Sequence, residues 1–134
     1  MFAVVILGYI QEIFSDVLED ATIVAIAKKL QEEIEEGIQT FGRTKNQNNE
    51  TIYAYEVDGL GNASVMDDSN VPNLVAAPYL GYCSTEDEQY LTTRQTLLSK
   101  ENPYFYEGKY AKGIGSSHTP ETVSYTHLTL PTKR

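Results

Sequence analysis

The sequence predicts an all-α fold of roughly four helices, with a small β-hairpin in the loops between them. Two observations lead to this fold class. Apolar residues recur at helical spacing in separate stretches of the 134-residue chain, and one short stretch alternates in polarity before a glycine turn. An apolar fraction of 41% is enough for one modest core. We therefore expect a single domain.

The first predicted helix opens the chain and carries a wide apolar stripe. A stripe of this width is typical of a helix that faces a core. No capping residue precedes it, so we expect the chain to begin inside a helix. The apolar residues recur at alternating spacings of three and one, and they are Phe2, Val5, Ile6, Tyr9, Ile10, Ile13 and Phe14.

A second helix is expected to begin near Asp20 or Thr22, either of which can cap it. The short break between the two stripes predicts an antiparallel helical hairpin. The second stripe comprises Ile23, Ile26, Ala27, Leu30, Ile34 and Ile38. The acidic residues between its positions predict a solvated face, and they are Glu32, Glu33, Glu35 and Glu36.

The middle of the chain is predicted to hold a loop and the β-hairpin. Residues 42–49 lack both a period and apolar residues, which indicates an exposed loop. Residues 52–57 alternate in polarity, Asp58 and the glycine after it form a turn signal, and residues 63–66 are a second short run. This hairpin would deliver the two aspartates at 67 and 68 to its end.

Two further helices are predicted downstream. Asn70 is a candidate cap for a short helix over residues 74–79, and Pro72 suits its first turn. A longer helix is expected over residues 86–98. Residues 99–120 are rich in Gly, Pro and Tyr and predict an ordered but irregular loop.

Charge and cysteine content exclude several kinds of partner. The formal net charge of −9 argues against nucleic acid, because phosphates require Lys and Arg. Cys83 is the single cysteine, so no internal disulfide can form. Gln11, Glu12 and Asp16 interrupt the apolar opening too early for a membrane span, and the opening lacks the charged start of a signal peptide. A cytoplasmic location is favoured over secretion, and the location itself stays open.

A polar, glycine-punctuated block at residues 53–82 is the strongest candidate for ligand recognition. It combines acids, amides and aromatics, which are costly to bury and suit a polar ligand such as a sugar. Asp67 and Asp68 can each bind sugar hydroxyls, and the Asn70 amide can donate and accept. Adjacent aspartates, with Cα atoms about 3.8 Å apart, are poorly placed to act as an acid and a base on opposite faces of a sugar.

This block has two other interpretations, and the first stays open. Residues 68–70 can simply cap the helix that is expected near Pro72. The oxygen donors would also suit calcium, but they lack the spacing of a calcium loop, so we expect no metal site.

Four motifs in this order resemble glycoside hydrolase family 125. They are Asp58-Gly59-x-Gly61-Asn62, Met66-Asp67-Asp68-x-Asn70-Val71-Pro72, Pro78-Tyr79-Leu80-Gly81-Tyr82 and Gly113-Ile114-Gly115-Ser116-x-His118-Thr119-Pro120. The resemblance implies a metal-independent exo-α-1,6-mannosidase that inverts the anomeric centre and uses no cofactor. It also implies a partial (α/α)6 barrel and a mannose-containing oligosaccharide as substrate.

The resemblance further implies that Asp67, Asp68, Asn70 and His118 bind the substrate. Ser117 stands where the family is expected to carry proline, so the local geometry around the histidine departs from the family pattern. The resemblance places the catalytic acid and base outside this chain, and no catalytic residue is expected within it.

Residues 1–123 are accordingly expected to be a fragment of a single catalytic domain, with Met1 an internal methionine. Residues 124–134 do not continue the family pattern and resemble a translated sequencing adapter, so we expect a non-native tail there. Two alternatives stay open. One is a self-contained, non-catalytic carbohydrate-binding module, and the other is a different (α/α)6 enzyme, such as a sugar epimerase or a glucoamylase-like hydrolase.

Overall fold

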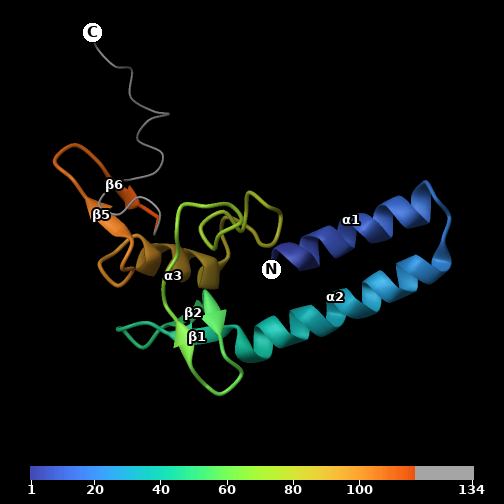
Figure 1. Ribbon diagram of the computed structural model, residues 1–134, viewed down its shortest axis with the longest axis horizontal. Coiled ribbons are helices and arrows are strands. Elements are labelled where there is room, and N and C mark those ends of the chain that lie inside the picture. Colours follow the sequence, from blue (N-terminus) through green and yellow to red (C-terminus); the bar gives the residue numbers. More distant parts are fainter. Residues whose placement is uncertain (117–134) are drawn as a thin grey trace, which may run out of the picture.

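A long helical hairpin forms the N-terminal part of the structure (Figure 1). The computed structural model describes residues 1–116. Helix α1 spans Phe2–Asp16 and α2 spans Ala21–Phe41, and the two lie side by side. Asp20 caps α2, because its Oδ1 accepts hydrogen bonds at 3.0 and 3.2 Å from the backbone amides two and three residues later. The predicted helical hairpin and its cap are confirmed.

The apolar stripe of α1 is covered on one side only. In the described part of the chain no residue of α1 is buried, and Phe2, Ile6, Tyr9 and Ile13 are exposed. The prediction of a core-facing helix is wrong for this structure, because one neighbouring helix cannot cover a stripe of this width. Within residues 1–116 no helix is long and apolar enough to span a lipid bilayer.

Between the hairpin and residue 116, the structure has three two-stranded antiparallel sheets. Residues 43–45 of the first sheet and both strands of the last sheet lie in stretches that were predicted to be loops, since three-residue strands are too short to show alternation. Residues 51–53 of the first sheet overlap the stretch 52–57 that was predicted to be the first strand of the hairpin. The predicted β-hairpin exists as the middle sheet, with strands of two residues each. The pairs are β1 (Arg43–Lys45) with β2 (Thr51–Tyr53), β3 (Glu56–Val57) with β4 (Ala63–Ser64), and β5 (Phe105–Glu107) with β6 (Lys112–Ile114).

These sheets make the predicted all-α class wrong, and the partial (α/α)6 barrel is not seen either. The described residues contain three α-helices, and the third, α3, spans Glu88–Leu97. A ring of helices requires each helix to pack on other helices. Here α1 pairs with α2, whereas α3 packs mainly against β2 (Figure 1). The described residues therefore form one helical hairpin joined to a mixed α and β region.

The buried core of this mixed region lies where β2 meets α3. Ile52 of β2 is 0% exposed and Leu97 of α3 is 1% exposed, and Tyr53 and Tyr90 are also buried. Thr93 Oγ1 on α3 accepts a hydrogen bond of 2.9 Å from Tyr53 N. A side chain of the helix thus satisfies a backbone amide of the strand, which holds the two elements in one register.

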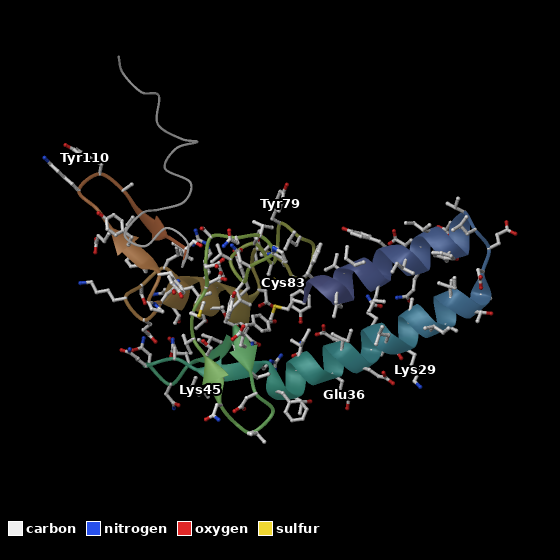
Figure 2. The ribbon with its side chains drawn as sticks, in the orientation of Figure 1. Lys29, Glu36, Lys45, Tyr79, Cys83 and Tyr110 are labelled. Carbon is white, nitrogen blue, oxygen red and sulfur yellow. The ribbon has the colours of Figure 1, made fainter. Side chains whose placement is uncertain are left out.

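Residues 74–79 form a series of turns instead of the predicted short helix. The segment is tied to α2 at its end, because Tyr82 Oη donates to both carboxylate oxygens of Glu35 at 3.1 Å. Glu35 is therefore half-buried and bonded, contrary to the predicted solvated face. Glu36 beside it does point outward (Figure 2).

Candidate functional site

Two segments that carry family-like motifs lie side by side, although they are far apart in the sequence. Ser69 N donates to Gly115 O at 2.9 Å, and Gly115 N donates to Tyr104 O at 2.7 Å. A side-chain bond of 3.2 Å from Asn70 Nδ2 to Ser116 Oγ joins the same two segments. Residues 67–70, called the acidic loop below, are thus anchored at the end of β6.

Asp67 is the first residue of this loop, and its side chain is buried, with 0% exposed. Its Oδ1 accepts a hydrogen bond from Leu74 N at 3.3 Å and its Oδ2 accepts one from Val75 N at 3.0 Å. Burial raises the pKa of this carboxyl to about 6, although the two backbone amides oppose the shift. Asp67 therefore holds the turns at residues 74–79 in place.

The raised pKa of Asp67 predicts a pH-dependent contribution to stability. The folded protein binds the Asp67 proton more tightly than the unfolded chain does, because the carboxyl of the unfolded chain has the ordinary pKa of 3.8. The protonated carboxyl therefore contributes its full stabilisation of the fold below about pH 4, and this stabilisation is lost as the pH rises through 6. Between pH 4 and pH 7 we expect the melting temperature of Asp67→Asn to rise relative to that of the wild type at the same pH. Thermal unfolding of both proteins at each pH measures this. A difference that stays constant with pH would contradict the assignment.

Asp68 and Asn70 form the outer edge of the acidic loop. Asp68 is half-buried and Asn70 is exposed. Asp68 Oδ1 accepts from Asn70 N at 2.8 Å, and Asp68 Oδ2 accepts from Asn70 Nδ2 at 3.0 Å. From below, Asn73 Nδ2 donates to Asp68 O at 2.9 Å. Two bonds donated by Asn70 therefore hold the Asp68 carboxylate, and Asn73 fixes the backbone of Asp68.

This edge offers hydrogen-bond acceptors to a ligand. Both N–H groups of the Asn70 amide are used, one by Asp68 Oδ2 and one by Ser116 Oγ. Within residues 1–116 no group donates to Asn70 Oδ1. An ionised carboxylate accepts about four hydrogen bonds, so Asp68 keeps capacity beyond its two bonds to Asn70. Asn70 is placed to accept from a ligand, and the pair suits two neighbouring hydroxyl groups that donate.

The remaining predicted site residue, His118, lies outside the described residues, as does Ser117. The structure places Ser116 directly before them, at the end of the strand that anchors the acidic loop. Of the aromatic residues in the polar block, Tyr79 is 89% exposed and points away from the ribbon (Figure 2). Tyr82 packs edge-on against Tyr53, with ring centroids 6.1 Å apart, and so has a structural role.

A cavity of about 330 Å³ opens beside the acidic loop but does not include its side chains. Its lining comes from both helices of the hairpin and from the turns, and it includes Phe2, Ile38, Tyr55, Pro72, Leu74 and Tyr82. Asp67, Asp68 and Asn70 do not line it within the part of the chain that the structure describes. In the same part, no three His, Cys, Asp or Glu side chains are grouped to hold a metal ion.

Sequence reasoning missed three residues that build this site. Asn73 supports Asp68 from below, Ser116 receives the Asn70 amide, and Asn102 bonds to the backbone of Asp67. Asn73 and Ser116 stand inside or beside the motifs quoted above, so proximity to a motif was a usable signal. Asn102 stands in a stretch that was predicted to be irregular loop, and nothing local in the sequence distinguishes it.

The chain is similar to a known protein family, to a curated protein and to a solved structure. Residues 1–128 match the family described as Glyco_hydro_125, metal-independent alpha-mannosidase (GH125). The matched range ends beyond Val123, and the boundary of the non-native tail stays a prediction. A curated relative is the meiotically up-regulated gene 157 protein of Schizosaccharomyces pombe, which is 45% identical over 86 residues. That alignment covers 63% of this chain and 17% of the yeast protein.

A solved structure from Streptococcus pneumoniae is also similar. It is described as a metal-independent alpha mannosidase in a non-productive substrate complex with alpha-1,6-mannobiose. The TM-score is 0.84 and the sequence identity is 62%, over 87% of this chain and 28% of that one. The chain therefore spans less than a third of the length of either relative.

Proposed function

The chain belongs to the GH125 family of metal-independent alpha-mannosidases, and from this premise we propose that the enzyme containing it removes terminal α-1,6-linked mannose with inversion. The substrates are oligosaccharides or N-glycans with a non-reducing mannose. The 62% identical Streptococcus pneumoniae protein supports this linkage, because it was solved with alpha-1,6-mannobiose. The chain contributes substrate-binding loops to the longer enzyme.

The observation that carries the proposal is the acceptor edge formed by Asp68 and Asn70. A mannose ring presents neighbouring hydroxyl groups, and each can donate one hydrogen bond. The Asp68 carboxylate is fixed by a bond from a backbone amide, and the Asn70 amide is fixed by its bond to Ser116 after β6. Their oxygens can therefore accept bonds from the sugar hydroxyls without a rearrangement of either side chain. His118, the next polar residue after Ser116 and Ser117 on the anchoring segment, adds a third contact to the sugar in this proposal.

Asp67 supports this edge from beneath and positions it. Its carboxylate faces the amides of Leu74 and Val75, so the sugar contacts that were expected of it pass to Asp68 in this proposal. Inverting glycosidases require an acid and a base roughly 6.5–9.5 Å apart on opposite sides of the bond that is cleaved. Adjacent residues on one short loop do not meet that requirement, and we assign the acid and the base to parts of the enzyme outside this chain.

The proposal is tested with the full-length enzyme and a set of mannobioses. We expect hydrolysis of α-1,6-mannobiose, slower or no hydrolysis of the α-1,2 and α-1,3 isomers, and an unchanged rate in excess chelator. Proton NMR should show β-mannose as the first product, because inversion at an α-linkage yields the β-anomer. A preference for another linkage would overturn the assigned specificity, and α-mannose as the first product would overturn inversion.

A further inference from the structure

We propose that Asn102 is a positioning residue that holds the two sugar-binding segments of the enzyme in register. The inference rests on the proposed function, because it concerns the acidic loop and the segment that leads to His118. It rests equally on a set of contacts that motif and spacing did not reveal.

The side-chain amide of Asn102 is 1% exposed and all four of its hydrogen-bonding positions are used. Its Nδ2 donates to Asp67 O at 3.0 Å and to Leu97 O at 3.1 Å. Its Oδ1 accepts from Asp67 N at 3.3 Å and from Tyr104 N at 3.1 Å. One side chain therefore joins the acidic loop, the end of α3 and the entry to β5.

These bonds close a ring through the site. From Asn102 the ring passes to Asp67, along the acidic loop to Ser69, and across the 2.9 Å backbone bond to Gly115. From Gly115 it continues through the 2.7 Å bond to Tyr104 and returns to the Asn102 side chain. One side of the ring carries the proposed sugar contacts Asp68 and Asn70, and the other leads to Ser116, which receives the Asn70 amide.

The chemistry of this position requires a primary amide. Two carbonyl oxygens and two amide N–H groups converge on one buried side chain. That side chain must therefore donate two hydrogen bonds and accept two. A carboxylate has no donors, and its second oxygen would face the carbonyls of Asp67 and Leu97. A displaced loop moves the acceptor edge away from the sugar, and a shift of about 1 Å can cost on the order of a hundredfold in rate.

Asn46 provides a matched control for Asn102. It is 8% exposed, its Nδ2 donates to Glu50 Oε2 at 2.8 Å and Thr96 Oγ1 at 3.0 Å, and its Oδ1 accepts from two backbone amides. It therefore loses the same donors when replaced by aspartate. Its bonds hold the turn between β1 and β2, and in residues 1–116 none of its side-chain bonds reaches the acidic loop or β6.

The test is a double-mutant cycle in the full-length enzyme with α-1,6-mannobiose as substrate. Asn102→Asp and Asn46→Asp are each made in the wild type and in Asp68→Asn, and kcat/KM is measured on folded protein below the melting temperature. We expect both single variants to melt at lower temperature. Asn102→Asp is expected to lose tenfold or more in kcat/KM, mainly through KM, whereas Asn46→Asp stays within about twofold of the wild type.

The decisive comparison is made in the Asp68→Asn background. If Asn102 acts through the acidic loop, its replacement there should cost less than about threefold in kcat/KM. A purely structural role predicts the same loss in both backgrounds, and that result overturns the inference. If Asn102→Asp yields no folded protein, the uncharged Asn102→Ser takes its place in the same cycle, with the same two outcomes.

Failure of this inference differs from failure of the proposed function. An enzyme in which Asp68→Asn impairs turnover but Asn102→Asp is as active as Asn46→Asp contradicts the role of Asn102 alone. A wild-type enzyme that does not hydrolyse the disaccharide overturns the proposed function and this inference with it.

Discussion

Replacing Asp68 with asparagine is expected to lower kcat/KM for α-1,6-mannobiose by about ten- to a hundredfold in the full-length enzyme. A hydrogen bond from a hydroxyl to a charged group contributes about 1.5–3 kcal/mol, which corresponds to that range when the bond forms in the transition state. The substitution also sets an NH2 group against the Asn70 amide, which bonds to Asp68 Oδ2 in the wild type. Asn70→Ala should act in the same direction with a smaller effect, since it removes a neutral acceptor.

Asp20 serves as the control, because its carboxylate has a capping role only. It accepts from two backbone amides at the start of α2, at the end of the helical hairpin farthest from the β-strands (Figure 1). Asp20→Ala removes the capping oxygen and should lower the melting temperature while leaving kcat/KM unchanged. If Asp68 only caps the turn that follows it, Asp68→Asn will show the Asp20 pattern. Measuring kcat/KM and the melting temperature for both variants distinguishes the two roles. If Asp68→Asn changes the melting temperature but not kcat/KM, Asp68 does not bind the sugar.

Truncating Ile52 to alanine is expected to lower the free energy of unfolding by about 2–5 kcal/mol, the range found for large-to-small changes in cores. Ile52 is 0% exposed on β2, where the strand packs against α3, so its removal leaves a cavity between them. Ile52→Val removes a single methylene and should cost about 0.5–1.5 kcal/mol. Leu60→Ala should cost little, because Leu60 is 87% exposed.

Denaturant unfolding of the three variants measures these differences. Equal and small effects for Ile52→Ala and Leu60→Ala would show that the contact between β2 and α3 does not form the core. The contact between β2 and α3 also supports the acidic loop indirectly, because Asn102 bonds both to the end of α3 and to Asp67 in that loop. We therefore expect Ile52→Ala to lower kcat/KM as well, but only near its melting temperature.

The helices were predictable because their apolar periods are long. The stripes of α1 and α2 extend over several turns, and Asp20 provides a cap with ordinary local chemistry. The strands were only partly predictable: the alternation of residues 52–57 indicated the β-hairpin, but strands of two or three residues are too short for alternation to mark their bounds. The turns at 74–79 were predicted to be a helix because Asn70 and Pro72 are local signals for a helix start, and these signals do not show that the segment is tied to Asp67 and Asn73 outside it.

The site was predictable as a stretch of sequence, but the role of each residue within it was not. Asp67 and Asp68 are neighbours with the same chemistry, yet one is fully buried and the other reaches the surface. Only tertiary contacts separate them. These contacts come from distant parts of the chain. Asn102, which bonds to Asp67, lies 35 residues away from it, and Ser116, which bonds to Asn70, lies 46 residues away. Local pattern cannot connect residues over such separations.

A crystal structure of the full-length enzyme with α-1,6-mannobiose would test the central claim most directly. We expect Asp68 and the Oδ1 atom of Asn70 each to lie about 2.6–3.2 Å from a hydroxyl oxygen of the terminal mannose, with Asp67 still bonded to Leu74 and Val75. A disaccharide bound in the enzyme with Asp68 and Asn70 facing only solvent would contradict the account.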